Sequence, residues 1–423
     1  MSEPPTGWAE TTLGEMVRWG SGGTPRRNVA RYYGGSIPWA IVGDLNDGLV
    51  TTTAGTITDD GLAESSARLV RPGTVLIAMY GSIGKLGIAG IEMATNQAIG
   101  FADPRQGLDS RFLFWYLRAE RRNLAHAGKG ATQKNISQTV LRSWPLPLPP
   151  LSEQRRIVAA IEEHLSRLDA ADASISPALQ RTEVLRSALV TTLVERGEWP
   201  RTPWKQAGRS QNGRAFPSRD YSANGIRLLR PGNLHVSGRV EWDTKNTRHL
   251  PESYADEHPR FVVGENELVM NLTAQSLKDE FLGRVCLTQT GERCLLNQRI
   301  ARLTPNEAVP RFVMYAFKSR RFRAFVNSLN KGSLIQHMFT SQLADYELPL
   351  PPLEDQRRIV QEIDERLSRI DAMRASIERA QRRSAALRAA ILERAFRGEL
   401  VPQDPADEPA EALLARIRNA LDS

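Results

Sequence analysis

The sequence has few cysteines and no long apolar run. Its 423 residues include only Cys286 and Cys294, which excludes a disulfide framework and favours a reducing compartment, so we expect a cytoplasmic protein. No apolar stretch approaches the roughly 20 residues that a membrane-spanning helix needs. The first five residues lack a basic segment followed by an apolar one, so we expect no secretory signal.

Recognisable motifs for catalysis and metal binding are also missing. The segment Gly81–Lys85 departs from the phosphate-loop pattern, because Met79 and Leu86 stand where Gly and Ser or Thr are required. The histidines never fall in metal-ligand spacing, and neither cysteine belongs to a CxxC pair. We therefore expect no catalytic residue, no metal site and no cofactor in this chain.

Positive charge is concentrated in two large segments. The formal net charge is +8 and the pI is near 9.7, which favours an acidic partner, with nucleic acid as the first candidate. At about 100–200 residues per domain, the length predicts several domains. The net charge changes along the chain: +3 over 1–151, −1 over 152–197, +7 over 198–353, +3 over 354–398 and −4 over 399–423.

The chain contains an internal repeat of about half its length. Leu146–Val158 matches Leu348–Val360, and 18 of 25 positions are identical between 146–170 and 348–372. Weaker similarities at offsets near 200 include Asn96-Gln97 and Asn297-Gln298. So long a period indicates duplication of a whole unit rather than a solenoid of short repeats. The junction and the stretch after it are similar in the two copies, whereas the larger segments before them diverge. This contrast predicts one structural element common to both copies and two elements that have adapted separately.

The similar part of each copy predicts a long amphipathic helix, because apolar residues recur at spacings of 3, 4 and 7. Ser152 fits the N-cap of the first helix, and Gly197 and Gly398 fit the glycine that ends each one. Pro177 should kink or split the first helix, since proline lacks the backbone donor. Two such helices can cover each other's apolar stripes, and geometry weakly favours an antiparallel pair.

The larger segments predict mixed α/β structure. Short β-rich runs punctuated by Gly, Asn, Asp and Pro predict strands over 37–42, 74–79, 268–270 and 284–287. The aromatic runs 112–117 and 312–317 are more typical of helices with a buried face. The acidic tail after Leu400 predicts one short helix over 413–417.

These features together resemble the DNA-specificity subunit of type I restriction–modification systems. The resemblance rests on the twice-occurring junction Leu-Pro-Leu-Pro-Pro-Leu-x-x-Gln-Arg-Arg-Ile-Val, the element Thr95–Ile99 and the two Lys-Gly loops, and it covers about residues 8–400. It implies an α+β fold in which two mixed α/β target recognition domains are separated by two long helices, paired as an antiparallel coiled coil in a pseudo-two-fold tandem repeat. The implied parts are recognition domain 1 over 1–151, spacer helix region 1 over 152–197, recognition domain 2 over 198–353, spacer helix region 2 over 354–400 and the acidic, proline-containing tail over 401–423.

The resemblance also implies a division of labour. Each recognition domain would read one half of a split, asymmetric site in double-stranded DNA, and the helices would set the half-site spacing. They would also dock two modification subunits, which hold S-adenosylmethionine and methylate adenine. Restriction subunits that use ATP and Mg would complete the complex, and this chain would itself be non-catalytic. The divergence between the two domains predicts two different half-sites.

Candidate DNA contacts follow from polar and basic loops, because Gln and Asn can pair with adenine and Lys can bind guanine or phosphate. The alternative for each loop is a solvated turn without a contact. The candidates in the first copy are Arg26, Arg27, Lys85, Lys129, Thr132, Gln133, Lys134 and Asn135; those in the second are Arg214, Lys278, Arg284, Lys331, Gln336 and His337. Gln336 and His337 are the better base readers of their loop, and Arg214 matches Arg26 only loosely.

A second group of candidates lies at the two helix starts: Gln154, Arg155, Arg156, Gln356, Arg357 and Arg358. Positive charge there opposes the helix dipole. An acidic partner is therefore expected, first a carboxylate of the neighbouring domain or of a partner subunit, and second a DNA phosphate. Replacing Arg155 and Arg156 with Ala should weaken complex assembly more than it changes the sequence read.

Two other functions remain open on the sequence. A stand-alone methylase or nuclease with an unrecognised motif would modify DNA or bind its cofactor alone. A protein-binding scaffold with incidental basic charge would give no salt-dependent DNA affinity in its assembled complex.

Overall fold

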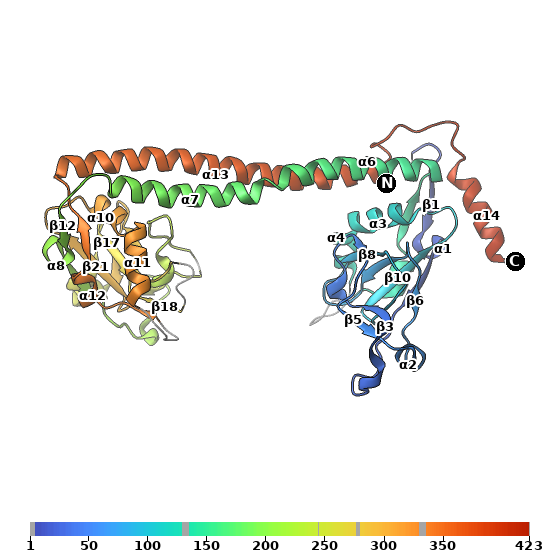
Figure 1. Cartoon of the computed structure of the whole chain (residues 1–423), viewed down its shortest axis with the longest axis horizontal. Helices are drawn as coiled ribbons and strands as arrows, with labels where there is room; N and C mark the ends of the chain where they lie inside the picture. Colours follow the sequence, from blue (N-terminus) through green and yellow to red (C-terminus); the bar gives the residue numbers. More distant parts are fainter. Residues whose placement is uncertain (1–4, 129–134, 244, 276–279, 330–335, 423) are drawn as a thin grey trace. The chain divides into compact units, whose positions relative to one another are not determined.

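The computed structural model describes residues 5–128, 135–243, 245–275, 280–329 and 336–422. The chain divides into two compact units. The first unit comprises residues 1–174 and 380–423, and the second comprises residues 175–379. Figure 1 gives the element labels used below.

The first unit contains two mixed sheets. One has the strand order β2-β10-β7-β8-β4, with β2 Val17–Ser21, β10 Ile99–Pro104, β7 Val75–Ala78, β8 Leu86–Ala89 and β4 Leu49–Val50. The other has the order β5-β3-β9-β6, with β5 Gly55–Ile57, β3 Tyr33–Ala40, β9 Met93–Thr95 and β6 Leu69–Val70. A separate ribbon pairs β1 Ala9–Thr12 with β11 Pro145–Leu148. Short helices complete this part: α1 Leu13–Met16, α2 Asp59–Ala63, α3 Ser110–Ala119, α4 Arg121–Ala127 and α5 Gln138–Arg142.

The second unit has the same strand order, with the counterpart of β4 reduced to one parallel bridge between Arg239 and Leu287 of β19. Its first sheet is β13-β21-β17-β19, with β13 Gly208–Asn212, β21 Ile300–Pro305, β17 Leu268–Asn271 and β19 Val285–Leu287. Its second is β15-β14-β20-β16, with β15 His249–Leu250, β14 Ile226–Leu229, β20 Cys294–Leu296 and β16 Val262–Val263. Two ribbons pair β12 Arg201–Pro203 with β23 Glu347–Pro349, and β18 Thr273–Ala274 with β22 Gln336–His337. The helices here are α8 Trp204–Ala207, α9 Ser253–Glu257, α10 Pro310–Ala316, α11 Arg320–Leu329 and α12 Thr340–Ala344.

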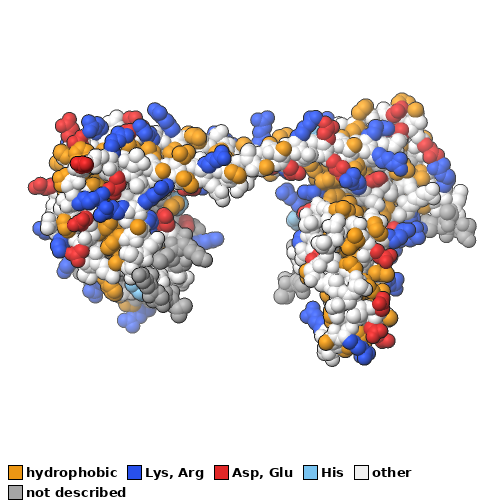
Figure 2. Space-filling model, in the orientation of Figure 1, with side chains coloured by type: hydrophobic (Ala, Val, Ile, Leu, Met, Phe, Trp, Pro, Cys, Tyr) orange, Lys and Arg blue, Asp and Glu red, His pale blue; other side chains and the backbone are white. Residues whose placement is uncertain are grey.

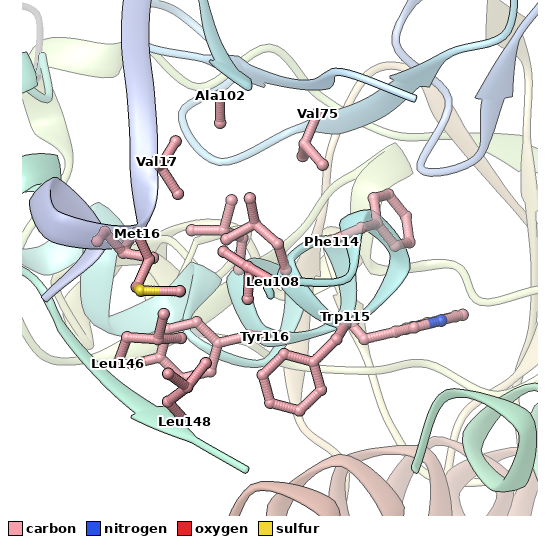
Figure 3. Packing of buried hydrophobic residues seen from close by; sticks show 14 of the residues in the cluster. Met16, Val17, Val75, Ala102, Leu108, Phe114, Trp115, Tyr116, Leu146 and Leu148 are labelled. Carbon is pink, nitrogen blue, oxygen red and sulfur yellow. The ribbon is translucent and has the colours of Figure 1, made fainter. Parts of the chain in front are cut away.

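The predicted strands and aromatic helices are confirmed. The four β-rich runs fall in β3, β7, β17 and β19, and the aromatic runs form α3 and α10 with their aromatic side chains buried. In the first unit, Val17, Val75 and Ala102 point from the sheet toward α3, and Leu146 and Leu148 of β11 close another side of the same core (Figure 3). Burying these aromatic side chains supplies much of the hydrophobic stabilisation of each unit.

The repeated helical stretch forms α6 Leu151–Asp172 and α7 Ile175–Val194 in the first copy, and the single helix α13 Leu353–Phe396 in the second. The interruption that Pro177 predicted is confirmed, with helical hydrogen bonding broken at residues 173–174. The proline then occupies the first turn of α7, where its missing donor costs little. Gly197 and Gly398 follow the helices with φ of +96° and +74°, as predicted for terminating glycines.

Two details of the helices differ from the sequence prediction. The first helix begins at Leu151 with Pro150 at its N-cap, and Ser152 instead donates a hydrogen bond to Asp407 at 2.5 Å. The apolar stripe near each helix start packs on the core of its own unit rather than only on the other helix, as Ile161 and Ile363 show. Apolar side chains further along the helices are exposed to solvent, for example Leu185 at 51% and Leu387 at 43%.

Helix pairing is antiparallel within each unit. In the first unit, Arg388 of α13 bonds Asp172 of α6 at 2.8 Å. In the second unit, Arg374 and Asp371 of α13 pair with Glu183 and Arg186 of α7, respectively.

The acidic tail returns to the first unit. Its helix α14, Ala410–Asp422, is longer than the predicted 413–417. Leu414 is buried in the core of the first unit, and the Ala410 N–H donates to the Gly7 carbonyl at 3.0 Å. None of the described helices is long and apolar enough to cross a membrane.

Candidate nucleic-acid interface

The turn that follows β7 places Lys85 at the mouth of a hollow of about 540 Å³, together with Arg121 and His126. Lys85 Nζ donates to the Val42 carbonyl at 3.2 Å. Arg121 fixes the turn, because its Nε donates to the Gly84 carbonyl at 2.7 Å and its guanidinium pairs with Asp47. Burial opposes ionisation of Asp47, but the bonds from Arg121 and the Leu86 N–H outweigh it and lower the pKa of Asp47. The turn is therefore held in one shape.

The loop predicted as a base reader ends beside this turn. Asn135 forms a β-bridge with Tyr80, and the Ile136 N–H donates to the Met79 carbonyl at 3.1 Å. The predicted contacts Lys129, Thr132, Gln133 and Lys134 lie outside the described residues. The structure thus brings Asn135 within one turn of the Lys85 segment, although 50 positions of sequence separate them.

The second unit repeats this arrangement. Gln336 and His337 form β22, which pairs with Ala274 and Thr273 directly after β17. The Met338 N–H donates to the Leu272 carbonyl at 3.0 Å, matching the bond of Ile136. His337 therefore occupies the position of Asn135. The predicted contacts Lys278 and Lys331 lie outside the described residues.

Arg284 does not lie in this β-bridged pair of segments. Its guanidinium stacks over Phe281 at 4.8 Å and donates to the Leu234 carbonyl at 3.2 Å. The side chain is half-buried and lines a pocket between β19, α7 and α10. Its backbone carbonyl accepts from the Asn271 N–H at 2.9 Å, two residues before the strand that pairs with β22.

Arg26 and Arg27 are exposed. They follow the segment Gly22–Gly23, where the chain crosses closely over the backbone of Thr95 and Ile99 and is held there by hydrogen bonds. The Gly22 and Gly23 N–H groups donate to the carbonyls of Ile99 and Thr95 at 3.2 and 2.9 Å. A Cβ on Gly22 would lie 2.0 Å from the Thr95 carbonyl oxygen, so the chain passes too closely for any side chain.

The same crossing corrects the match of Arg214 with Arg26. The Gly213 and Arg214 N–H groups donate to Ile300 and Leu296, so Arg214 occupies the place of Gly23. Arg214 is exposed there. Sequence alone could not match Gly22-Gly23 with Gly213-Arg214, because the two copies differ in the number of residues between these segments and the repeated Asn-Gln pair.

Asn96 and Asn297 have a structural role in both copies. Their side-chain oxygens accept from the backbone N–H two residues ahead, at 3.1 Å in each case. These bonds shape the same tight turn twice and leave Gln97 and Gln298 exposed.

The glutamines at the helix starts are buried clamps. Gln154 accepts from the Asp109 N–H at 2.8 Å and donates to the Gly107 and Pro149 carbonyls, both at 3.0 Å. Gln356 repeats this with the Val309 N–H at 2.8 Å and the Pro351 carbonyl at 2.8 Å. Each clamp joins a helix start to the loop before the aromatic helix of its own unit.

The arginines beside the clamps have different surroundings. Arg156 Nη2 pairs with Asp407 of the tail at 2.7 Å, and the bond from Arg156 lowers the pKa of Asp407. Arg358 Nη2 pairs with Asp355 of its own helix at 2.5 Å. Arg155 and Arg357 are exposed, and Arg155 lines a groove of about 630 Å³ with Arg18 and Arg105.

The sequence analysis did not single out two cations at the C-terminal ends of the aromatic helices. Arg118 is the penultimate residue of α3, and Lys318 lies two residues after the end of α10, 200 positions further along the chain. Extending the repeat through the aromatic runs would have found this pair, because the offset is constant there. Figure 2 shows Lys and Arg side chains interleaved with acidic ones on the visible face of both units.

Comparison with known proteins identifies the family. Residues 5–175 and 280–384 match the family model described as the type I restriction modification DNA specificity domain. The chain therefore belongs to the type I restriction–modification specificity subunits, which are non-catalytic.

Individual relatives agree with this assignment. The chain is 23% identical over 392 residues to the type I restriction enzyme MjaVIII specificity subunit of Methanocaldococcus jannaschii, covering 87% of each chain. Its fold is similar to a chain in a solved structure that describes complex assembly and conformational transition of a type I system, with a TM-score of 0.76, 19% identity and coverage of 94% and 100%. The HsdS subunit of Thermoanaerobacter tengcongensis gives a TM-score of 0.57, 19% identity and coverage of 94% and 98%.

Proposed function

We propose that residues 1–151 and 198–353 are two target recognition domains, each of which reads one half of a bipartite, asymmetric DNA site. The observation that carries the proposal is the repeated pairing of two segments at one place in the fold. Asn135 bridges the turn after β7, and His337 bridges the segment after β17. Polar side chains held at the same edge of both domains are suited to meet base edges in the major groove.

The two domains carry different chemistry at matching positions. An amide at Asn135 can pair bidentately with adenine, whereas the imidazole of His337 and the amide of Gln336 offer other donor and acceptor patterns. The lysines of these loops, with Arg26, Arg27 and Arg214, supply phosphate contacts. Different readers at equivalent positions support two different half-sites and hence a non-palindromic target.

The helical regions 152–197 and 354–400 are proposed as the antiparallel spacer that sets the half-site distance. Each domain is tied to the helix that follows it. Gln154 and Gln356 clamp the helix starts, and Arg111 and Arg311 pair with Glu162 and Asp364 at 3.2 and 3.0 Å. Such ties let a helix transmit position to the domain it carries.

The spacer is also proposed to dock two modification subunits, which bind S-adenosylmethionine, while restriction subunits bring ATP and Mg. Exposed apolar positions support this. Val184, Leu185 and Met373 of the second unit are 60%, 51% and 53% exposed. Large exposed apolar side chains grouped on a helix pair mark a surface that awaits a protein partner. The exposed Arg155 and Arg357 are proposed to meet acidic groups of these partners.

The test is DNA binding by the chain assembled with its modification subunits. Affinity should fall steeply with salt, and a duplex carrying both half-sites should bind far more tightly than unrelated DNA. Replacing Gln336 and His337 with Ala should cost about 1–3 kcal/mol on the cognate duplex and relax one half-site only. The matched control is Gln361→Ala, because Gln361 is an exposed residue of α13 whose side chain bonds Glu365 of the same helix. Equal binding to cognate and unrelated DNA would contradict the proposal.

A further inference from the structure

A pocket of about 380 Å³ in the second unit is lined by four cationic side chains. Arg186 comes from α7, Arg284 from the position before β19, Lys318 from the turn after α10 and Arg323 from α11. Among the described residues of the lining, the carboxylates are Glu183 and Glu280. In the lining that the structure describes, positive side chains therefore outnumber negative ones.

Two of the four cations have no carboxylate partner among the described residues. Lys318 Nζ donates to the Val236 carbonyl at 3.0 Å, and Arg323 Nη1 donates to the Leu282 carbonyl at 2.7 Å. Neither side chain has a carboxylate oxygen within 4.0 Å in the part of the chain that the structure describes. Charges withdrawn from water normally have an opposite charge beside them, because desolvation is costly otherwise.

Glycines make room for both of these cations. A Cβ on Gly238 would lie 2.9 Å from Lys318 Nζ, and a Cβ on Gly283 would lie 2.8 Å from Arg323 Nη2. Both glycines have positive φ, +93° and +68°, which other residues rarely adopt. The backbone is thus shaped around the two charged groups, and a side chain at either position would displace them.

The surroundings also act on the charge of Lys318. Burial lowers the pKa of this ammonium to about 8, and repulsion from Arg186 and Arg284 adds to the effect. The other titratable groups around it are Glu183 of α7, Glu280 before β19, the Cys286 thiol of β19, the Tyr315 hydroxyl of α10 and Arg323 of α11. An anion in the pocket would offset this cost, because it would restore the preference for the charged form.

We propose that this pocket seats a backbone phosphate of the bound DNA, with Lys318 and Arg323 as its ligands, an inference that rests on the proposed function. A phosphodiester carries one negative charge and accepts several hydrogen bonds, which suits an ammonium beside a guanidinium fork. Such a contact carries no sequence information and fixes the position of the second recognition domain on the duplex.

The test uses the chain assembled with its modification subunits and duplexes of unrelated and of cognate sequence. Lys318→Gln should weaken binding to both duplexes by the same factor, about 5–10-fold. It should also make the negative slope of log affinity against log salt less steep by about 0.9. Lys318→Arg should retain the affinity and the slope. The matched control is Lys205→Gln, which removes a lysine of the same unit that pairs with Asp345 on the surface.

Two further readouts separate this proposal from others. Wild-type affinity should fall as the pH rises from 7 to 9, and Lys318→Arg should flatten that fall, because arginine stays protonated. Titration with inorganic phosphate alone should give no Lys318-dependent binding at millimolar concentration; saturable binding would assign the pocket to a free anion instead. If a folded Lys318→Gln complex binds its specific sequence with an unchanged salt slope, the phosphate contact in this pocket is contradicted and the proposed function is not. If the wild type shows no salt-dependent DNA binding, the proposed function is contradicted as well.

Discussion

At the scale of single residues, the repeat conserves a buried amide within this chain. Gln154 and Gln356 are 0% and 1% exposed, and each satisfies backbone groups of a loop about 45 residues away in sequence. The repeated Gln-Arg-Arg run marked these positions as a junction. Sequence could not tell that the glutamine is the structural member and the arginines the surface members, because the groups it bonds are backbone atoms without a sequence signature.

Gln154→Ala should destabilise the first unit by about 2–4 kcal/mol. The change leaves the Asp109 N–H and the Gly107 and Pro149 carbonyls buried without these partners. Denaturant unfolding of the full chain measures the loss. Gln361→Ala should change stability by less than about 0.5 kcal/mol, since that side chain is exposed. Equal losses for both variants would show that Gln154 is not a clamp.

The two cysteines should be inert in the native protein. Burial raises the pKa of Cys286 and of Cys294 to about 12, so both thiols stay protonated at pH 8, and the thiolate is the reactive form. A colorimetric thiol reagent should therefore titrate neither cysteine at pH 8 until denaturant is added, after which it should titrate both. Rapid native labelling would contradict the burial of β19 and β20.

At the scale of elements, each aromatic helix is bound to the long helix that follows it. Trp115 and Arg111 of α3 bond Glu162 of α6, and Tyr315 and Arg311 of α10 bond Asp364 of α13. The sequence predicted these helices and their aromatic faces. It did not predict the ties, because a narrow apolar stripe on a long helix indicates only that something covers it. The aromatic helix of the same unit, α3 on α6 and α10 on α13, is one of the elements that cover the stripe.

Asp364→Ala should loosen residues 198–353, the proposed second recognition domain, from α13. It removes the partner of Arg311 and of the Tyr315 hydroxyl, and should cost about 1–3 kcal/mol in unfolding free energy. Burial first, and then the bond to Asp364, raise the pKa of Tyr315 to about 12, so the variant should also bring that pKa closer to the ordinary tyrosine value. Ultraviolet titration of tyrosinate checks this, with Tyr315→Phe identifying the signal. An unchanged titration curve would rule out the tie.

The tail should stay attached until strongly acidic pH. Hydrogen bonds from Arg156 and then Ser152 lower the pKa of Asp407. A lowered pKa in the folded state means that this contact stabilises the fold above the ordinary aspartate range near 3.9 and is lost as the pH falls through the lowered value. Asp407→Asn should mimic the loss at neutral pH.

Limited trypsin digestion measures tail attachment. Asp407→Asn should speed cleavage after Arg416 and Arg418 on α14 several-fold at pH 7.5. Glu411→Gln is the matched control, since the described residues show no ion pair for this exposed tail acid. Equal cleavage rates for Asp407→Asn and the wild type would show that the Arg156 contact does not hold the tail.

At the scale of the whole molecule, the two units share their strand order, while the residues at the proposed reading position, Asn135 and His337, differ. The duplication was evident in sequence because the junction kept 18 of 25 residues. The shared sheets were not evident, since strands that are mostly two to six residues long carry little periodicity. The matching of Asn135 with His337 required the structure, because hydrogen bonds define it and insertions elsewhere shift the numbering.

The central claim, that the chain selects a split DNA site with one half read by each domain, is tested most directly by mapping methylated adenine across the genome. Cells holding the modification gene should be compared with this gene intact, with it deleted, and with the Gln336→Ala, His337→Ala double variant. The account predicts a non-palindromic, two-part motif that vanishes on deletion and whose specificity changes in one half only in the double variant. A methylation pattern identical in all three strains, with the modification subunit expressed and active, would contradict it.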